Sequence, residues 1–149
     1  MRRLTCALAL LTLLTGCGGW QRGLSLDEVA IEAQPDANNN TALPVDVALV
    51  VGPGVADQLA KLPAAEWFRR RAQLQRDFPD SLVVLSWELV PGQRAVARPD
   101  RDGIIDGYLF AGYGTPGDHR VRLGFEDQQV KVLLQASGFV VQGAAKEGR

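Results

Sequence analysis

The sequence predicts a mainly β protein, a two-sheet β-sandwich with a helical insertion after the second strand. Two observations predict this fold class. About seven short stretches alternate polar and apolar residues or are continuously apolar, and turn-forming residues separate them. The one long stretch with helical periodicity, residues 64–78, follows the second of these strands. Many strands with a single helical excursion are typical of two packed sheets with an insertion.

The first two strands are predicted at residues 28–33, which alternate polar and apolar side chains, and at residues 44–51, which are more apolar. The loop between them is rich in turn formers and, at about ten residues, is longer than most hairpin loops. We interpret it either as an ordinary solvated loop or as a partner-binding loop. Its residues are Gln34, Pro35, Asp36, Ala37, Asn38, Asn39, Asn40, Thr41, Ala42 and Leu43.

The helical insertion begins after Gly52-Pro53-Gly54. Residues 55–62 predict a short helix, and Pro63 suits the first turn of a second helix over residues 64–78. The buried face of that second helix is predicted to consist of Trp67, Phe68, Leu74 and Phe78. The arginine run at residues 69–71 indicates a solvated helix face, with contact to anionic headgroups or an acidic partner as the alternative.

Further strands are predicted at residues 82–90, 94–98, 104–113, 119–125, 130–134 and 139–142. In residues 82–90, one face of the strand carries the apolar residues Val83, Leu85, Trp87 and Leu89. Pro91-Gly92 then predicts a type II turn. A charged turn at residues 98–103 is similar to part of a calcium loop, but it lacks the third acid and the closing glutamate.

The N-terminal segment has the pattern of a secretory signal. Arg2 and Arg3 precede an uncharged apolar run, residues 4–14, that is too short to span a bilayer. Its end, Leu14-Thr15-Gly16-Cys17, resembles the bacterial lipobox, which is cut before an acylated cysteine. We expect residues 1–16 to be removed and Cys17 to carry diacylglycerol and an acyl chain. An ordinary signal that is cut near Cys17 is the alternative.

The remaining chain divides into three parts. Residues 17–26 predict a glycine-rich tether, residues 27–143 the sandwich domain, and residues 144–149 a frayed tail. The residue after Cys17 is glycine rather than the aspartate that commonly retains lipoproteins at the inner membrane. We therefore expect a lipid anchor in the outer membrane, with the domain on the periplasmic face.

Charge and cysteine content exclude several function classes. The net charge is −1, and it falls to about −3 when the signal is removed, so nothing favours a nucleic-acid partner. Both cysteines belong to the signal or the lipidation site, which leaves none for a disulfide in the domain. We expect no cofactor beyond the lipid on Cys17.

We expect no catalytic or metal site. His119 is the one histidine, no serine lies in a G-x-S-x-G motif, and the carboxylates are scattered. An enzyme would need reacting groups around His119, and we rank this reading last. A periplasmic lipoprotein that binds a small ligand or a cell-envelope polymer is the stronger alternative, and its pocket would use the aromatic residues Trp67, Trp87, Tyr108 and Tyr113 unless they belong to the core.

The order of features resembles the TssJ outer-membrane lipoproteins of type VI secretion systems. The resemblance spans residues 29–141 and rests on the lipobox and on five segments: Pro35 to Pro44, Val45 to Val51, Ala65-Glu66-Trp67-Phe68, Leu89-Val90-Pro91-Gly92-Gln93 and Tyr108 to Tyr113. Two features depart from the family. Val50-Val51-Gly52-Pro53 replaces an aromatic residue and a leucine, and His119 to Arg122 replaces an arginine-tryptophan pair.

This resemblance implies a transthyretin-like sandwich with no enzymatic activity. It implies a structural scaffold of the secretion membrane complex that tethers the periplasmic domain of a TssM-like inner-membrane partner to the outer membrane. In the family, a loop between early strands contributes to that contact. The corresponding loop here is Gln34 to Leu43.

Overall fold

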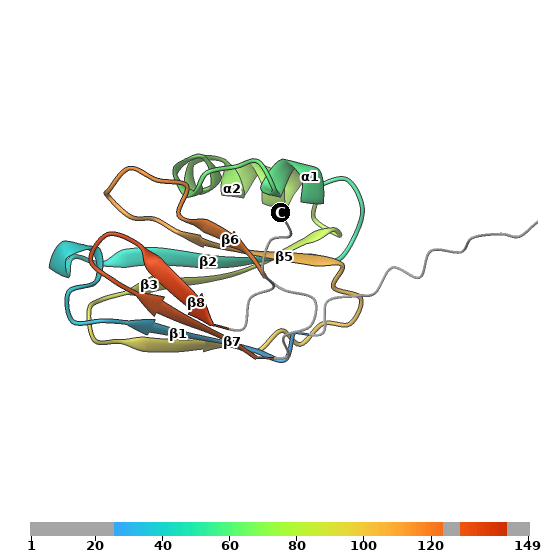
Figure 1. Ribbon diagram of the computed structural model, residues 1–149. Coiled ribbons are helices and arrows are strands. Elements are labelled where there is room, and N and C mark those ends of the chain that lie inside the picture. The colour runs from blue at the N-terminus through green and yellow to red at the C-terminus, as the bar shows by residue number, and fades with distance from the viewer. Residues whose placement is uncertain (1–25, 124–128, 143–149) are drawn as a thin grey trace, which may run out of the picture.

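Two four-stranded sheets pack face to face in the computed structural model, which describes residues 26–123 and 129–142 (Figure 1). Sheet A has the order β4-β1-β7-β8, and sheet B has the order β3-β2-β5-β6. The predicted mainly β sandwich is therefore confirmed. The strands of sheet A are β1 (Glu28–Ala33), β4 (Arg94–Ala97), β7 (Gln129–Leu134) and β8 (Phe139–Gln142). Those of sheet B are β2 (Leu43–Val50), β3 (Leu82–Leu89), β5 (Asp106–Ala111) and β6 (Arg120–Arg122).

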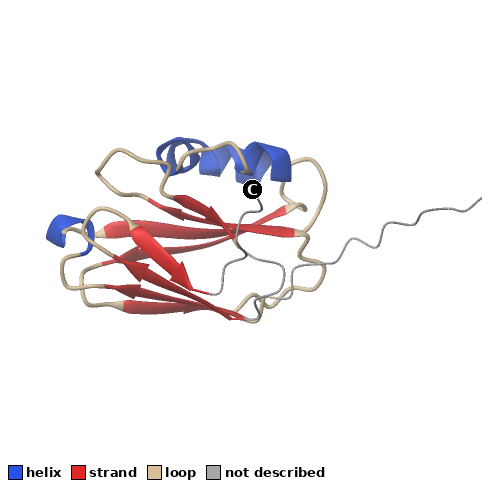
Figure 2. Cartoon of the chain, viewed as in Figure 1, coloured by secondary structure: helices blue, strands red, loops and turns tan. Residues whose placement is uncertain are grey.

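The helical insertion covers the outer face of sheet B (Figure 2). It contains α1 (Ala56–Leu59) and α2 (Ala64–Asp77), with Pro63 at the N-cap of α2. The third helical segment, the one-turn η1 (Ala37–Asn40), lies in the loop between β1 and β2. No helix among the described residues is long and apolar enough to cross a bilayer. The position of the insertion agrees with the sequence-based prediction.

Two hydrophobic clusters hold these layers together. One lies between the sheets and includes Val29 and Ile31 of β1 with Val45 and Val47 of β2. The other lies between sheet B and the helices, where Ala48 and Val50 of β2 meet the apolar face of α2. The predicted buried face of α2 is confirmed. Strand β2 is buried on both faces, which explains why its sequence is more apolar than that of β1.

Several boundaries differ from the prediction: β5, for example, covers Asp106–Ala111 rather than residues 104–113, and two further differences concern Leu26 and His119. Leu26, assigned by sequence to the tether, is only 5% exposed and belongs to the cluster between the sheets. The strand expected to begin at His119 begins at Arg120, because His119 has a left-handed backbone with φ of 43°. Phe125, the last residue of the strand predicted at residues 119–125, lies outside the described residues.

Candidate functional site

The loop between β1 and β2 lies at the opposite end of the sandwich from the first described residues (Figure 1). Strand β1 begins two residues after Leu26 and leads directly into this loop. Its six residues span about 20 Å, at roughly 3.3 Å per residue. The domain therefore presents the loop on the side away from the point where the N-terminal segment joins it.

Asn38 is the centre of the loop and is 8% exposed. Its Nδ2 donates to Thr41 Oγ1 at 2.7 Å and to the Ala42 carbonyl oxygen at 2.9 Å. The Thr41 hydroxyl donates back to the Asn38 carbonyl oxygen at 2.6 Å. These hydrogen bonds close the loop on itself, so its shape does not depend on a partner.

Three successive asparagines form a left-handed turn at the tip. Asn38, Asn39 and Asn40 have φ of 47°, 53° and 63°. Asparagine occupies this region more readily than other non-glycine residues because its short amide can hydrogen-bond locally. The repeat of three asparagines is thus the local cause of the turn.

The predicted partner-binding residues divide into two groups by exposure. Ala37 and Leu43 are buried, and Leu43 is the first residue of β2, so neither offers a side chain to a partner. Together with Asn38, they anchor the loop on the core. Gln34 is half-buried. The exposed group consists of Pro35, Asp36, Asn39, Asn40, Thr41 and Ala42.

Neighbouring loops hold the β1–β2 loop from several sides. Gly114, in the β5–β6 loop, donates its N–H to Asn38 Oδ1 at 3.2 Å. The Asn38 N–H donates to the carbonyl oxygen of Gln135, in the β7–β8 turn, at 3.1 Å. Gly92, in the turn after β3, donates to the Ala33 carbonyl oxygen at 2.9 Å. Four connections from both sheets therefore meet at this end of the sandwich.

His119 braces this group of loops. Its Nε2 lies 2.9 Å from the Thr115 carbonyl oxygen, to which it donates, and its ring lies 4.7 Å from the Tyr113 ring, centroid to centroid. The Tyr113 hydroxyl donates to the Gly138 carbonyl oxygen and accepts the Gln135 N–H. Burial raises the pKa of Tyr113 to about 12, so this donor stays protonated. The histidine contacts fit a structural role better than a reacting group.

Of the four aromatic residues considered for a ligand pocket, two lie in the core and two are half-buried against it. Trp67, on α2, is fully buried, and its ring stacks on that of Phe110 in β5 with 4.6 Å between the ring centroids. Tyr108 is 3% exposed and belongs to the same cluster. Trp87 and Tyr113 pack against the cluster between the sheets. The aromatic pocket that the alternative interpretation required is therefore not formed by these residues.

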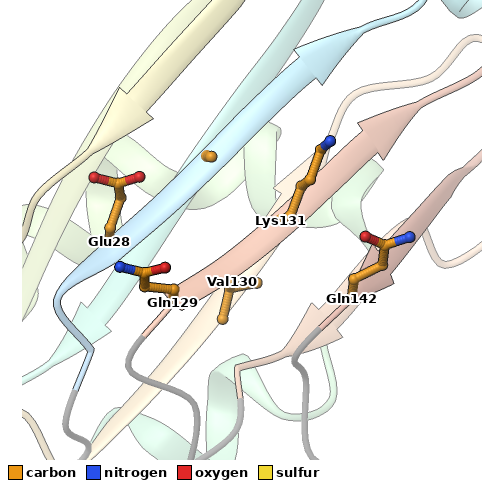
Figure 3. Close-up of a pocket in the computed structure, with 6 residues that line it drawn as sticks. Glu28, Gln129, Val130, Lys131 and Gln142 are labelled. Carbon is orange, nitrogen blue, oxygen red and sulfur yellow. The ribbon is translucent and has the colours of Figure 1, made fainter.

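An open depression of about 390 Å³ lies on the outer face of sheet A (Figure 3). It is lined by Glu28, Ala30, Gln129, Val130, Lys131 and Gln142. None of these is aromatic, and Glu28 already pairs with Arg98 at 2.8 Å. Within residues 26–123 and 129–142, no buried side-chain nitrogen or oxygen lacks a hydrogen-bond partner. No buried, unpartnered polar atom therefore marks the depression as a ligand site.

Two further sequence-based expectations concern lipid and metal. Cys17, the expected lipidation site, lies outside the described residues. Over the part of the chain that the structure describes, no group of three or more histidine, cysteine or acidic side chains is arranged to hold a metal ion. The loop end of the sandwich, with its exposed asparagine tip, is the functional candidate that the geometry leaves.

No protein-family model and no curated protein matches this sequence. Solved structures share its fold. The T6SS lipoprotein TssJ1 from Pseudomonas aeruginosa matches with a TM-score of 0.57 and 15% identity, over 80% of this chain and 96% of that chain. Serratia marcescens Lip, a membrane-bound component of the type VI secretion system, matches with a TM-score of 0.54 and 15% identity, over 77% and 95%.

A third match is a chain in a structure of the T6SS protein TssM C-terminal domain from EAEC. Its TM-score is 0.58 at 14% identity, over 77% of this chain and 95% of that chain. This chain therefore has the β-sandwich fold of the TssJ and Lip lipoproteins.

Proposed function

We propose that this chain is a TssJ-type lipoprotein of a type VI secretion membrane complex. In this role it is anchored in the outer membrane by lipid on Cys17, with its domain in the periplasm. It acts as a structural scaffold without enzymatic activity, and it binds the periplasmic domain of a TssM-type inner-membrane protein through the exposed residues of the loop Gln34 to Leu43.

The observation that carries this proposal is the position of the loop. β1 carries the chain from the first described residues to the opposite end of the domain, where the asparagine tip is exposed. In the proposed role, lipid on Cys17 holds the first of these ends near the membrane. A tether between two membranes needs this separation of its two attachments. The matches to TssJ1, to Lip and to a chain in a TssM structure support the same role.

The rigidity of the loop is suited to binding. Asn38 fixes the backbone by hydrogen bonds to Thr41, Ala42 and Gly114 before any partner arrives. A preorganised loop loses less conformational entropy on association than a flexible one, and this raises affinity without new contacts. The lipid anchor adds a second attachment and so raises the local concentration of the domain at the complex.

A binding measurement with the mature lipidated chain in detergent tests the proposal. The probe is the purified periplasmic domain of the TssM-type protein encoded in the same cell. The test variant is N39G/N40G, since glycine takes positive φ readily and preserves the backbone while it removes both exposed amides. We expect at least about tenfold weaker binding, which corresponds to roughly 1.4 kcal/mol.

The matched control is D102G, which changes an exposed residue of the β4–β5 loop at the other end of the sandwich. Its affinity should equal that of the unchanged chain. Equal affinity for N39G/N40G would remove the loop tip from the interface and leave the scaffold role standing. Absence of binding by the unchanged chain would overturn the scaffold role itself.

A further inference from the structure

Strand β3 is the longest edge strand of the sandwich. It is outermost in sheet B and has eight residues, whereas the other edge strands, β4, β6 and β8, have four, three and four. Its inner side pairs with β2 along its whole length, from Leu82 opposite Val50 to Leu89 opposite Leu43. Within the described ranges, nothing pairs with its outer side.

The hydrogen bonds of β2 show which backbone groups of β3 are free. In an antiparallel strand, successive residues direct their N–H and C=O groups to opposite sides. The Pro44 carbonyl oxygen accepts from Gly112, next to β5, so the even-numbered residues of β2 face β5 and the odd-numbered ones face β3. The register pairs Val45 with Trp87, so the odd-numbered residues of β3 face β2.

The even-numbered residues of β3 therefore face outward. The Leu82 N–H is bonded to the Phe78 carbonyl oxygen at 3.0 Å, which closes the beginning of the edge. The N–H and C=O groups of Val84, Ser86 and Glu88 have no hydrogen-bond partner among the described residues. Six unpaired groups at strand spacing form a template for another strand.

The edge of β3 lacks the usual protection against strand addition. Residues 82–89 contain no proline, lysine or arginine, whereas β6 carries arginine at both ends and β4 begins with Arg94. The apolar side chains near the β3 edge are incompletely covered. Val83, Leu85 and Trp87, which point between the sheets, are half-buried although they pack against the core. An additional strand would cover this remaining apolar surface.

We propose that the outer edge of β3 binds an extended segment of a partner protein, which adds a fifth strand to sheet B. The segment pairs with the backbone of Val84, Ser86 and Glu88. It places apolar side chains beside Leu85 and Trp87, and a lysine or arginine beside Glu88. This site is separate from the asparagine tip and does not depend on the function proposed above.

Charge selects a heterologous strand over a second copy of this chain. Glu88 is exposed, is the one charged residue of β3, and makes no ion pair with any described residue. A second β3 has no lysine or arginine, so it offers Glu88 no cation in any register. Opposite charges on directly facing cross-strand residues are stabilising, whereas like charges are not. A basic segment therefore complements this edge and self-pairing does not.

The test uses synthetic strand peptides and the mature lipidated chain in detergent. One probe peptide alternates valine and threonine with a central arginine, and its control has glutamate in place of arginine. Amide hydrogen exchange followed by NMR reports each backbone N–H of β3. We expect the arginine peptide to slow the exchange of Val84, Ser86 and Glu88 by at least about tenfold, which is roughly 1.4 kcal/mol. The same peptide with N-methylated backbone groups should give no protection.

Reversing the charge completes the test. The variant E88K should lose most of the protection by the arginine peptide and gain protection from the glutamate peptide, whereas D100K, at an exposed loop position, should behave as the unchanged chain. Unchanged exchange of the three amides at millimolar arginine peptide would overturn the proposal. Protection of these amides in the absence of peptide would also overturn the proposal. If that protection rises with protein concentration, a second copy of the chain covers the edge; if it does not, another segment of the same chain covers it.

Discussion

Acidic and basic side chains form ion pairs on both outer faces of the sandwich, but the carboxylate is buried on one face and partly exposed to solvent on the other. Beneath α2, on the outer face of sheet B, Asp46 is fully buried and accepts hydrogen bonds from Trp67 Nε1 at 2.8 Å and Arg71 Nη1 at 2.9 Å. On the outer face of sheet A, Glu32 pairs with Arg94 at 3.1 Å, and Lys131 lies 3.9 Å away. The Arg94 side chain is 74% exposed.

The contrast shows that burial, more than distance, determines the energetic effect of an ion pair. An exposed pair contributes about 0–1 kcal/mol because water and salt screen it. A buried carboxylate that loses its partner costs about 3–5 kcal/mol because its charge remains desolvated. The Asp46 group therefore fixes α2 on sheet B, whereas the ion pairs of sheet A mainly keep an uncovered face polar.

The arginine run on α2, residues 69–71, is not uniformly a solvated face. A solvated helix face was expected for residues 69–71, and Arg69, with a side chain 74% exposed, fits it. Arg71, whose stem helical periodicity places on the apolar face, is 39% exposed, and its guanidinium reaches Asp46 and lies over the Phe68 ring at 5.5 Å from the centroid. One arginine of the run is thus part of the helix–sheet contact.

The largest effect is expected for R71M. This change leaves Asp46 buried without its cation, and we expect the free energy of unfolding to fall by about 3 kcal/mol, the lower end of the range for a buried pair, because the Arg71 side chain is 39% exposed. Urea unfolding followed by tryptophan fluorescence measures it. The matched control is R70M, whose side chain is 43% exposed and 3.9 Å from Glu66; it should cost less than about 1 kcal/mol. Equal losses for the two variants would remove the distinction between an ion pair to a buried carboxylate and one to a partly exposed carboxylate.

A smaller loss is expected for W67F. Phenylalanine keeps a ring against Phe110 but leaves Asp46 without its indole N–H donor. An unmade hydrogen bond to a buried acceptor costs about 1–3 kcal/mol. The same unfolding measurement, with W87F as the control at a half-buried position, should place W67F between R71M and the control. A loss as small as that of W87F would mean that Arg71 alone satisfies Asp46.

The helix-covered face should also make the protein sensitive to alkali. Burial and the hydrogen bond to Asp106 raise the pKa of Tyr108 to about 12, above its ordinary value of 10.0. The folded state thus holds this proton more tightly than the unfolded state does. Stability contributed by Tyr108 is present below pH 10 and is lost as the pH rises to about 12.

Unfolding free energies measured across this pH window test that prediction. The decline should be shallower in Y108F, which lacks the titrating hydroxyl. Tyr113 should still contribute there, since burial raises its pKa to about 12 as well. An identical decline in Y108F and the unchanged chain would contradict the assignment of the raised pKa to Tyr108.

The smallest effect is expected for E32A on sheet A. The change removes the ion pairs to Arg94 and Lys131, both of which are largely in solvent, and should cost less than about 1 kcal/mol. Raising the salt concentration should reduce that difference further, because the pairs are screened. A loss of unfolding free energy as large as that of R71M, and unchanged by salt, would contradict the assignment of the Glu32 ion pairs as weak, solvent-screened contacts.

The local sequence determined most of the secondary structure. Period-two alternation placed β1 at its observed bounds, and helical periodicity placed α2 with Trp67 and Leu74 inward. These patterns succeed because side-chain direction follows from the backbone repeat of a strand or a helix. The resemblance to TssJ lipoproteins then indicated the fold that the solved structures share.

Only the tertiary structure decided how distant residues combine. Asp46 and Arg71 are separated by twenty-five residues, and Asn38 and Gly114 by seventy-six, so no local repeat encodes either contact. Likewise, the alternation in residues 82–90 predicts the strand β3, yet that pattern does not reveal that it lies at an edge. Edge position depends on which strands pair, and pairing is set by packing of the whole sandwich rather than by the strand itself.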